Sequence, residues 1–446
     1  MAENSKHQKY TYFENKIIII IYFVLLFIIL GITNNNFIFE ITNVSNIYIT
    51  MKKINGPINV VRMEGSINGI KKVIYFFMDK HFEVQNQTDC NDPDNSINIA
   101  EYFKNNFIKL KDKNKTYDFF LEFSPELIAY QSEELYFTSD PKMKYIQTVG
   151  KFFRESVKYD VEKNKLLSLF DNVRLHYIDV RSTIQNYLYP ILQFLDRAIE
   201  NNNTNIHKFV AGSIIAIIKL MEIILQTLKN KENLPEKINI TAIKKFDIPL
   251  PELLGNADLR KEYFDHLVYL MNKFLHGYTN QNVKNIIHHY IDILVPELEF
   301  ALEDLINLYN EAKELNFESY QNTSIKNKFA NEFKKIEKYL TLRFAILVDL
   351  YFLRRFLDKK YITNAVVYTG TAHSVICIYI LNSIGFKITH CANCSIQDMA
   401  DLNSAVTNVS NFPFVESIIS LLEIFLQSPT NPQQCSDLSQ FPELFE

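Results

Sequence analysis

The chain has 446 residues, of which 47% are hydrophobic and 22% are charged, and its formal net charge is −4. This composition is typical of a protein with a buried core and excludes a disordered chain, and the length suits one large domain with an insertion, or two domains. The sequence contains no long basic run and no basic helical face, so nucleic acid is not an expected partner. The low content of Gly and Pro, 10 and 13 residues, favours long helices over a turn-rich β architecture.

Residues 17–32, IIIIIYFVLLFIILGI, form one uninterrupted apolar run. It is slightly shorter than the roughly 20 residues that span a bilayer, and longer than the core of a typical signal peptide. Because no small-x-small cleavage site follows, we favour an uncleaved signal anchor over a cleaved signal peptide. Lys6, Lys9 and Lys16 precede the run, so the positive-inside rule places the body of this single-pass protein on the non-cytoplasmic side. The lipid bilayer is therefore the expected partner of the anchor.

Short apolar runs and helical periods alternate after the anchor. Up to residue 185 we expect strands at 57–62, 72–77, 118–121 and 173–178, and helices at 97–109 and 145–169. From residue 182 to about 358 the period becomes helical, with helices at 212–228, 258–275, 283–316 and 325–358. The helix at 212–228 is apolar enough to suggest a second membrane span, but Lys219 and Glu222 favour a buried core helix.

The strand pattern resumes at Ala365 and continues to a strand at 386–390 and a helix at 414–427. We therefore predict an α/β fold with a split, mostly parallel sheet, flanking helices and a large all-helical insertion, preceded by one N-terminal transmembrane helix. The expected divisions are a cytoplasmic tail and anchor, the N-terminal half of the α/β domain, the helical insertion, and the C-terminal half with a tail. Their bounds are residues 1–35, 36–185, 186–360 and 361–446.

Residues 364–387, NAVVYTGTAHSVICIYILNSIGFK, carry the clearest local pattern. A buried strand leads into a glycine turn at Gly370, and His373 then opens a helix that ends at Gly385. Strand, turn and helix in this order form half of a βαβ unit, in which ligands bind beyond the carboxyl ends of the strands. We expect Ser374 to cap the helix. His373 is a candidate functional residue, although an isolated histidine also serves as a cap or a packing residue.

Other expected strands also end in ionisable residues, and parallel strands share their carboxyl edge. Two histidines and a carboxylate at such an edge suit a divalent metal ion with an open position for water. Without a metal, a carboxylate or a histidine serves as a general base. An Asp–Arg pair would orient or balance the site, or form a structural ion pair. The strand-end residues are Asp79 and His81, Glu122, Asp179 and Arg181, and His373.

This set of strand ends resembles the erythromycin-esterase/ChaN-like superfamily and, within it, the TraB/GumN/Tiki-type proteins. Gly370 to His373 match the family's Gly-x-x-His motif before a helix that ends in Gly. Glu122 matches the glutamate after the second strand, and Asp179 with Arg181 match the Asp/Arg pair of a middle strand. The first family motif departs here, because residues 78–81, MDKH, keep an acid and a histidine but lack the glycine.

The resemblance implies a membrane-anchored, metal-dependent hydrolase, with peptide hydrolysis as one option. It implies a divalent metal at His81, Glu122 and His373, and catalytic or supporting roles for Glu122, Asp79, Asp179 and Arg181. Within the superfamily, erythromycin esterases are metal-independent hydrolases and ChaN-like members bind haem. The substrate and any protein partner are left open.

The chain as a whole also resembles uncharacterised membrane-anchored proteins of giant DNA viruses, through residues 73–81, VIYFFMDKH, and residues 86–90, NQTDC. The alternative to a hydrolase is therefore a catalytically inactive viral protein that mediates interactions in a host membrane or a virion.

Five cysteines bear on the redox compartment. Cys391 and Cys394 could form half of a zinc site, but no second pair of Cys or His completes it. In an oxidising compartment we instead expect a disulfide from Cys90 to Cys391 or Cys394. Eight Asn-x-Ser/Thr triplets are compatible with a lumenal glycoprotein. They begin at Asn43, Asn86, Asn114, Asn202, Asn239, Asn322, Asn393 and Asn408.

Overall fold

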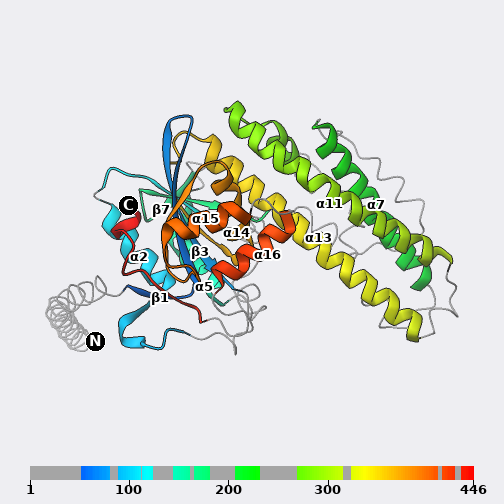
Figure 1. The fold of residues 1–446 in the computed structure, drawn as a ribbon, viewed down its shortest axis with the longest axis horizontal. Helices are drawn as coiled ribbons and strands as arrows, with labels where there is room; N and C mark the ends of the chain where they lie inside the picture. The colour runs from blue at the N-terminus through cyan, green and yellow to red at the C-terminus, as the bar shows by residue number, and fades with distance from the viewer. Residues whose placement is uncertain are drawn as a thin grey trace, which may run out of the picture.

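The computed structural model shows a mixed α/β body with a long helical arm (Figure 1). The structure describes residues 52–80, 89–111, 113–123, 144–160, 165–180, 206–231, 269–314, 323–409, 414–426 and 433–446. Within these residues, no helix is long and apolar enough to span a membrane. The expected anchor at residues 17–32 lies outside the described residues.

Six strands form the main sheet, in the order β10-β2-β3-β9-β5-β8. They are β2 (Asn59–Ile67), β3 (Ile70–Asp79), β5 (Tyr117–Leu121), β8 (Val173–Tyr177), β9 (Asn364–Gly370) and β10 (Lys387–Cys391). Strands β3, β9, β5 and β8 are parallel, whereas β2 and β10 pair antiparallel at one edge. Because β9 lies between β3 and β5, the sheet is split in sequence as predicted.

Strands β2 and β3 form a hairpin, and its turn residues Asn68 and Gly69 have φ angles of 50° and 78°. Positive φ at both turn positions matches the right-handed twist of a hairpin, and Asn and Gly are the residues that tolerate it best. In β3, Phe76 and Met78 enter one hydrophobic core and Tyr75 and Phe77 enter the other. Because both faces of this strand are buried, its sequence is a continuous apolar run without alternation.

Helices cover both faces of the sheet. One core includes α13 (Thr323–Asp358), α14 (Thr371–Ser383), α15 (Met399–Val409) and α16 (Phe414–Phe425), while the other includes α2 (Ile99–Leu110), α5 (Lys144–Ser156) and the short helix η4 (Glu443–Phe445). On the second face Phe103 packs edge-to-face on Phe77 and Phe119, with ring centroids 5.0 and 4.9 Å apart. Aromatic contacts of this kind add to the burial energy of the core.

The helical arm consists of α7 (Ile206–Asn230), α11 (Gln281–Glu314) and the first part of α13, and α13 returns from the arm to the sheet (Figure 1). Ile217 and Ile218 of α7 are buried in the same core as the sheet residues. Lys219 and Glu222 lie on the exposed side of α7, where their side chains are 2.6 Å apart. The prediction that this helix is a core helix is therefore confirmed.

A small sheet ties the C-terminal segment to the N-terminal half. Strand β1 (Lys53–Asn55) pairs with β4 (Ser96–Asn98) and with β11 (Cys435–Asp437). Beside it, a disulfide joins Cys90 to Cys435 with a Cα–Cα distance of 4.9 Å. The side-chain amide of Asn393 donates to the carbonyl oxygens of Ile58 and Cys435, both at 2.7 Å.

The predicted disulfide from Cys90 to Cys391 or Cys394 is wrong. Cys391 and Cys394 pair with each other across the turn that follows β10, with a Cα–Cα distance of 6.0 Å. Cys90 pairs with Cys435 because β11 returns to the same small sheet as the segment that precedes β4. Cys377 is buried and unbridged.

Two local predictions also differ from the structure. The helix expected at 145–169 ends at Ser156, and a hairpin of β6 (Val157–Asp160) and β7 (Lys165–Ser168) follows. Pairing in this hairpin satisfies backbone groups that a continued helix would otherwise satisfy. In addition, α15 was not predicted, although Asp398 caps its start by accepting from the amides of Ala400 and Asp401.

Replacing Gly65 with Ala is expected to destabilise the protein by about 1–3 kcal/mol, the usual cost of overpacking a core. A Cβ at this position in β2 would overlap the ring of Phe386. Denaturant unfolding followed by circular dichroism measures the change. Ser66→Ala, at the exposed neighbouring position, is the matched control. Equal unfolding midpoints for the two variants would show that Phe386 has room to move.

Candidate functional site

The carboxyl ends of three adjacent parallel strands meet where β9 lies between β3 and β5. Asp79 of β3 is the register partner of Gly370 of β9. On the other side of β9, the amide of Glu122 donates to the carbonyl oxygen of Tyr368 at 3.1 Å. The strand order therefore places the ends of β3, β9 and β5 at one edge, as the sequence predicts.

His373 lies between two carboxylates at this edge. Its Nε2 is 3.1 Å from Oε1 of Glu122, and its Nδ1 is 2.6 Å from Oδ1 of Asp349. Oε2 of Glu122 accepts from the amide of Gly370 at 2.7 Å. The side chains of Glu122, His373 and Asp349 are almost fully buried, with 2%, 8% and 2% exposed. We call these three residues the buried triad.

The first turn of α14 holds His373 in place. Gly370 occupies the N-cap position, and no side chain caps the helix there. The predicted cap by Ser374 is therefore wrong, because its hydroxyl lies 2.8 Å from that of Thr369 instead. Thr371 donates its hydroxyl to the carbonyl oxygen of Asp79 at 2.8 Å. The start of α14 is thus fixed to the ends of both β3 and β5.

The two carboxylates keep His373 protonated. Burial alone lowers the pKa of a histidine, but the negative charges of Asp349 and Glu122, and their hydrogen bonds, outweigh burial and raise the pKa of His373 to about 10. At neutral pH the ring is therefore an imidazolium that donates from both nitrogens. The triad carries one positive charge between two negative charges, in a site with little access to water.

Asp349 was missed by the sequence analysis. It lies in α13 within the apolar run of residues 344–352, FAILVDLYF, and is 2% exposed. The sequence does contain a signal for it, since Asp349 is the one carboxylate in a run of residues expected in a core. A buried charge requires a partner, so Asp349 was a candidate site residue. The sequence did not reveal His373 as the partner of Asp349, because the helix that carries Asp349 was assigned to the insertion and not to the sheet. The charge of Asp349 and, above all, burial raise the pKa of the nearby Cys377 thiol.

The other predicted strand-end residues lie at different places. Oδ1 of Asp79 accepts from the amide of Lys80 at 2.9 Å and from the side-chain amide of Gln434 at 2.7 Å. Asp179 is partly exposed, and its backbone amide donates to the carbonyl oxygen of Phe123, so it lies next to the residue that follows Glu122. His81 and Arg181 lie outside the described residues.

The described residues do not supply a complete metal site. Among them, no group of three His, Cys, Asp or Glu side chains converges on one point. The two carboxylates of the triad lie on opposite ring nitrogens of His373, so a cation at Nε2 would have Glu122 as its only second ligand in the triad. It would also replace the proton that Nε2 shares with Glu122. The third expected ligand, His81, lies outside the described residues.

A second polar cluster lies at the opposite end of β5. Arg174 binds Asp118 with two hydrogen bonds of 2.8 and 2.6 Å, and His176 lies 2.7 Å from the same carboxylate. Burial opposes ionisation of Asp118, but these partners lower its pKa. Burial is also the main reason that the pKa of His176 is lowered. Because Asp118 is bonded on both oxygens, this cluster is a structural link between β5 and β8.

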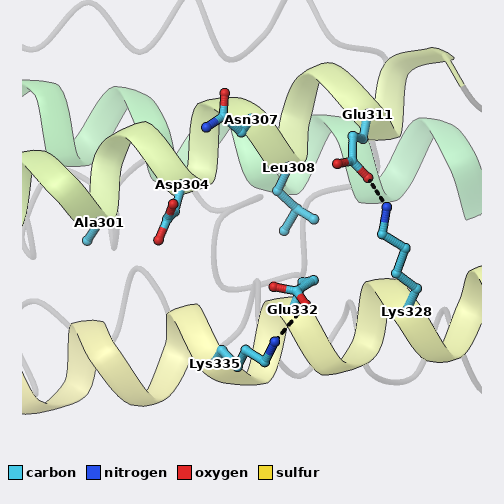
Figure 2. Close-up of a pocket in the computed structure, with 8 residues that line it drawn as sticks. All are labelled: Ala301, Asp304, Asn307, Leu308, Glu311, Lys328, Glu332 and Lys335. Carbon is cyan, nitrogen blue, oxygen red and sulfur yellow. Dashed lines mark hydrogen bonds and ion pairs between the residues drawn. The ribbon is translucent and has the colours of Figure 1, made fainter.

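A surface cleft of about 270 Å³ lies between α11 and α13 in the arm (Figure 2). Lys328 pairs with Glu311 at 2.9 Å and Lys335 with Glu332 at 2.7 Å. Exposed pairs of this kind contribute little to stability. Lys335 and Asp349 are 14 positions apart on α13, about 20 Å at the rise of an α-helix, so the cleft is separate from the buried triad.

These features define a disulfide-linked, mixed α/β protein with a carboxylate–histidine–carboxylate site at the carboxyl edge of its parallel strands. The chain belongs to the family of unknown function DUF5847, which matches residues 52–446. No solved structure matches the chain.

Three relatives from Acanthamoeba polyphaga mimivirus show the extent of the similarity. Uncharacterized protein R706 is 31% identical over 440 residues, 89% of this chain and 97% of its own length. Uncharacterized protein R160 is 30% identical over 445 residues, 89% of this chain and 98% of its own length. Uncharacterized protein R129 is 43% identical over 155 residues, 34% of this chain and 87% of its own length. The expected similarity to uncharacterised proteins of giant DNA viruses is therefore confirmed.

The stability of the protein is expected to fall as pH rises from 6.5 to about 10. The folded-state pKa of His373 lies above the ordinary histidine value of 6.5, so the folded state binds more protons than the unfolded state in this window. The contribution of His373 is complete below pH 6.5 and is lost as pH passes the folded pKa, with a slope of at most about 1.4 kcal/mol per pH unit.

Urea unfolding at several pH values measures this slope, which His373→Gln is expected to remove. His288→Gln is the control, because the pKa of His288 is lowered, chiefly by burial, and it contributes no slope of this sign. If wild type and His373→Gln have parallel stability profiles above pH 6.5, the imidazolium assignment is wrong.

Proposed function

We propose that the protein is a membrane-anchored hydrolase whose reaction takes place at Glu122 and His373. The observation that carries this proposal is the position of the buried triad at the carboxyl edge of β3, β9 and β5. In α/β sheets this edge is where ligands bind and where catalytic side chains gather. A histidine with a strongly raised pKa between two carboxylates is also the kind of perturbed group that gathers at functional sites.

The charges of the triad suit the hydrolysis of an ester or amide. Glu122 is the general base that takes a proton from water as its oxygen attacks the substrate carbonyl. The His373 imidazolium faces Glu122 and stabilises the negative charge that develops on the carbonyl oxygen. Glu122 then returns the proton to the leaving group, which gives an acid and an alcohol or amine. Asp349 holds the ring in orientation through Nδ1.

The resemblance to TraB/Tiki-type proteins suggests a metal-dependent form of this chemistry, with His81, Glu122 and His373 as ligands. A divalent ion bound there would act as a Lewis acid on the carbonyl or lower the pKa of a bound water. It would compete with the proton on Nε2 of His373, so metal binding should strengthen as pH rises.

A second candidate is a catalytically inactive protein that mediates interactions in a membrane or a virion. The supporting observation is that His373 has both ring nitrogens bonded to carboxylates and only 8% of its side chain exposed. In that case the triad is a structural link between α13, α14 and β5. The viral origin of the relatives is compatible with either candidate.

In this proposal the body of the protein lies on the non-cytoplasmic side of a membrane. The lysines before the apolar run at residues 17–32 support that orientation. The Cys90–Cys435 and Cys391–Cys394 bridges add support, because disulfides persist in oxidising compartments.

Glu122→Gln and His373→Gln are expected to lower ester and peptide hydrolysis by at least about 100-fold, the lower range for loss of a general base or an oxyanion partner. The assay uses the detergent-solubilised full chain with chromogenic esters and fluorogenic peptides. His390→Gln is the control, because this histidine lies on β10, outside the triad. Each variant is measured with a chelator and with added Mn²⁺ or Zn²⁺, at pH 6 and pH 9.

The outcomes separate the candidates. Loss of activity in Glu122→Gln and His373→Gln, but not in His390→Gln, supports the hydrolase. Restoration of the activity of chelator-treated wild type by added metal, mainly at pH 9, supports its metal-dependent form. The catalytically inactive candidate is favoured if wild type hydrolyses nothing under any metal condition, or if wild type and His373→Gln have equal rates.

The orientation is tested by protease protection in sealed membrane vesicles. We expect the segment after residue 36 to resist a protease added on the cytoplasmic side, and to be digested once detergent opens the vesicles. A cytoplasmic marker protein is the control for cleavage, and a lumenal one for sealing. Digestion of the body in sealed vesicles would overturn the proposed orientation.

A further inference from the structure

The C-terminal segment reaches the edge of the sheet that carries the buried triad. We call residues 433–446 the C-terminal strap. Its Gln434 is fully buried, and its side-chain nitrogen donates to Oδ1 of Asp79 at 2.7 Å. The backbone carbonyl of Gln434 accepts from the amide of Gly56 at 3.0 Å. A residue from the end of the sequence is thus bonded to the carboxyl end of β3.

A short chain of contacts connects this residue to His373. Gln434 bonds the side chain of Asp79, and the carbonyl oxygen of Asp79 accepts from the hydroxyl of Thr371. Thr371 is the first residue of α14, and His373 is the third. The amide of Gly370, just before Thr371, donates to Glu122. The position of Asp79 therefore bears on both His373 and Glu122.

The burial of an amide at position 434 has a cost in stability. Oε1 of Gln434 is buried and has no hydrogen-bond partner, whereas its nitrogen is bonded to Asp79. A buried polar atom without a partner destabilises the folded state. A methionine would fill the same space without this cost, so packing alone does not explain a glutamine here. Its contact with Asp79 does.

The Cys90–Cys435 disulfide holds this part of the strap. Cys435 follows Gln434 directly, and β11 adds pairing over only three residues, Cys435–Asp437. Farther along the strap, Phe445 is buried among aromatic rings, and Arg62 and Tyr75 donate to the carbonyl oxygen of Glu446 at 2.9 and 2.8 Å. Hydrogen bonds thus hold both ends of the strap, including those from Asn393 to the carbonyl oxygen of Cys435 and from Ser436 to that of Pro57, but the covalent link is beside Gln434.

We propose that Gln434 is a positioning residue of the Glu122–His373 site, and that reduction of the Cys90–Cys435 disulfide releases it. The chemistry is a thiol–disulfide exchange with a dithiol. The dithiol gives two electrons and two protons, becomes a disulfide itself, and leaves Cys90 and Cys435 as thiols. Cys435 is partly exposed, whereas Cys90 is buried, so a dithiol would approach the disulfide from the side of Cys435. The description of the site as catalytic rests on the proposed function, but the coupling between strap and site does not.

The test compares two neighbouring glutamines in the full-length protein. Gln434→Met removes the contact with Asp79 and a longer one of 3.4 Å with the carbonyl oxygen of Lys80, and it keeps the length of the side chain. Gln433→Met is the matched control, because Gln433 bonds the carbonyl oxygen of Asp89 and the side chain of Asn91 instead. The readouts are the NMR signals of the His373 ring and the Gly370 amide, in protein labelled at histidine and glycine. The His373 ring signal is assigned by its loss in His373→Gln.

We expect Gln434→Met to shift both signals and to leave the melting temperature within a few degrees of wild type, while Gln433→Met shifts neither. Any hydrolytic activity should fall about tenfold in kcat in Gln434→Met, the effect of about 1.4 kcal/mol from one lost hydrogen bond. The KM should not change, because Gln434 does not contact the substrate. Unshifted signals in Gln434→Met would overturn the positioning role.

The redox arm uses a Cys391→Ser/Cys394→Ser variant, in which Cys90–Cys435 is the disulfide left to reduce. Treatment with dithiothreitol is expected to shift the His373 and Gly370 signals in the same direction as Gln434→Met. Unchanged signals, with both thiols shown to be free, would overturn the redox control. Shifted signals in a protein that hydrolyses no substrate would instead count against the proposed function and leave the coupling in place.

Discussion

The insertion of β9 between β3 and β5 is the constraint on which the structure depends. Until residues 364–370 return to the sheet, the backbone groups on the facing edges of β3 and β5 have no partners in it. The two strands that they join are about 300 and 250 residues earlier in the sequence, so pairing them with β9 closes very long loops of chain. Long-range parallel pairing of this kind is slow to form. The candidate site therefore exists only in the complete fold.

The buried triad also connects segments that are distant in the sequence, through charged side chains. Asp349 belongs to α13, His373 to α14, and Glu122 to the end of β5, so one ring joins three elements. Removing a single partner from such a group leaves a buried charge uncompensated and typically costs several kcal/mol. The triad is thus one of the contacts that hold α13 against the sheet, and α13 continues from there into the arm (Figure 1).

The sequence predicts those parts of the fold in which local pattern and burial agree. The runs at β3, β5 and β9 are apolar because both faces of these strands are covered, and the turn at Gly370 followed by a helix places His373 correctly. The pairing of Glu122 with His373 follows from their positions at the ends of parallel strands.

Contacts between distant segments could not be predicted in this way. Asp349 lies in a helix whose docking depends on tertiary packing, and nothing in the spacing of Cys90 and Cys435 indicates that the strap returns to β1. The sequence also does not indicate that Gln434 is buried, because no local pattern distinguishes a buried glutamine from an exposed one. The hairpin of β6 and β7 was missed because short strand segments next to a helix have no period long enough to recognise.

The position of Asn393 bears on N-glycosylation at this site. Its side-chain nitrogen, the atom to which an N-linked glycan would be attached, donates to the carbonyl oxygens of Ile58 and Cys435. A sugar on this nitrogen would occupy the place where the strap joins the turn after β10. In a glycosylating compartment, modification of Asn393 and closure of the strap therefore exclude each other, and whichever comes first decides the outcome. Asn114 and Asn408 are exposed and lie outside this competition.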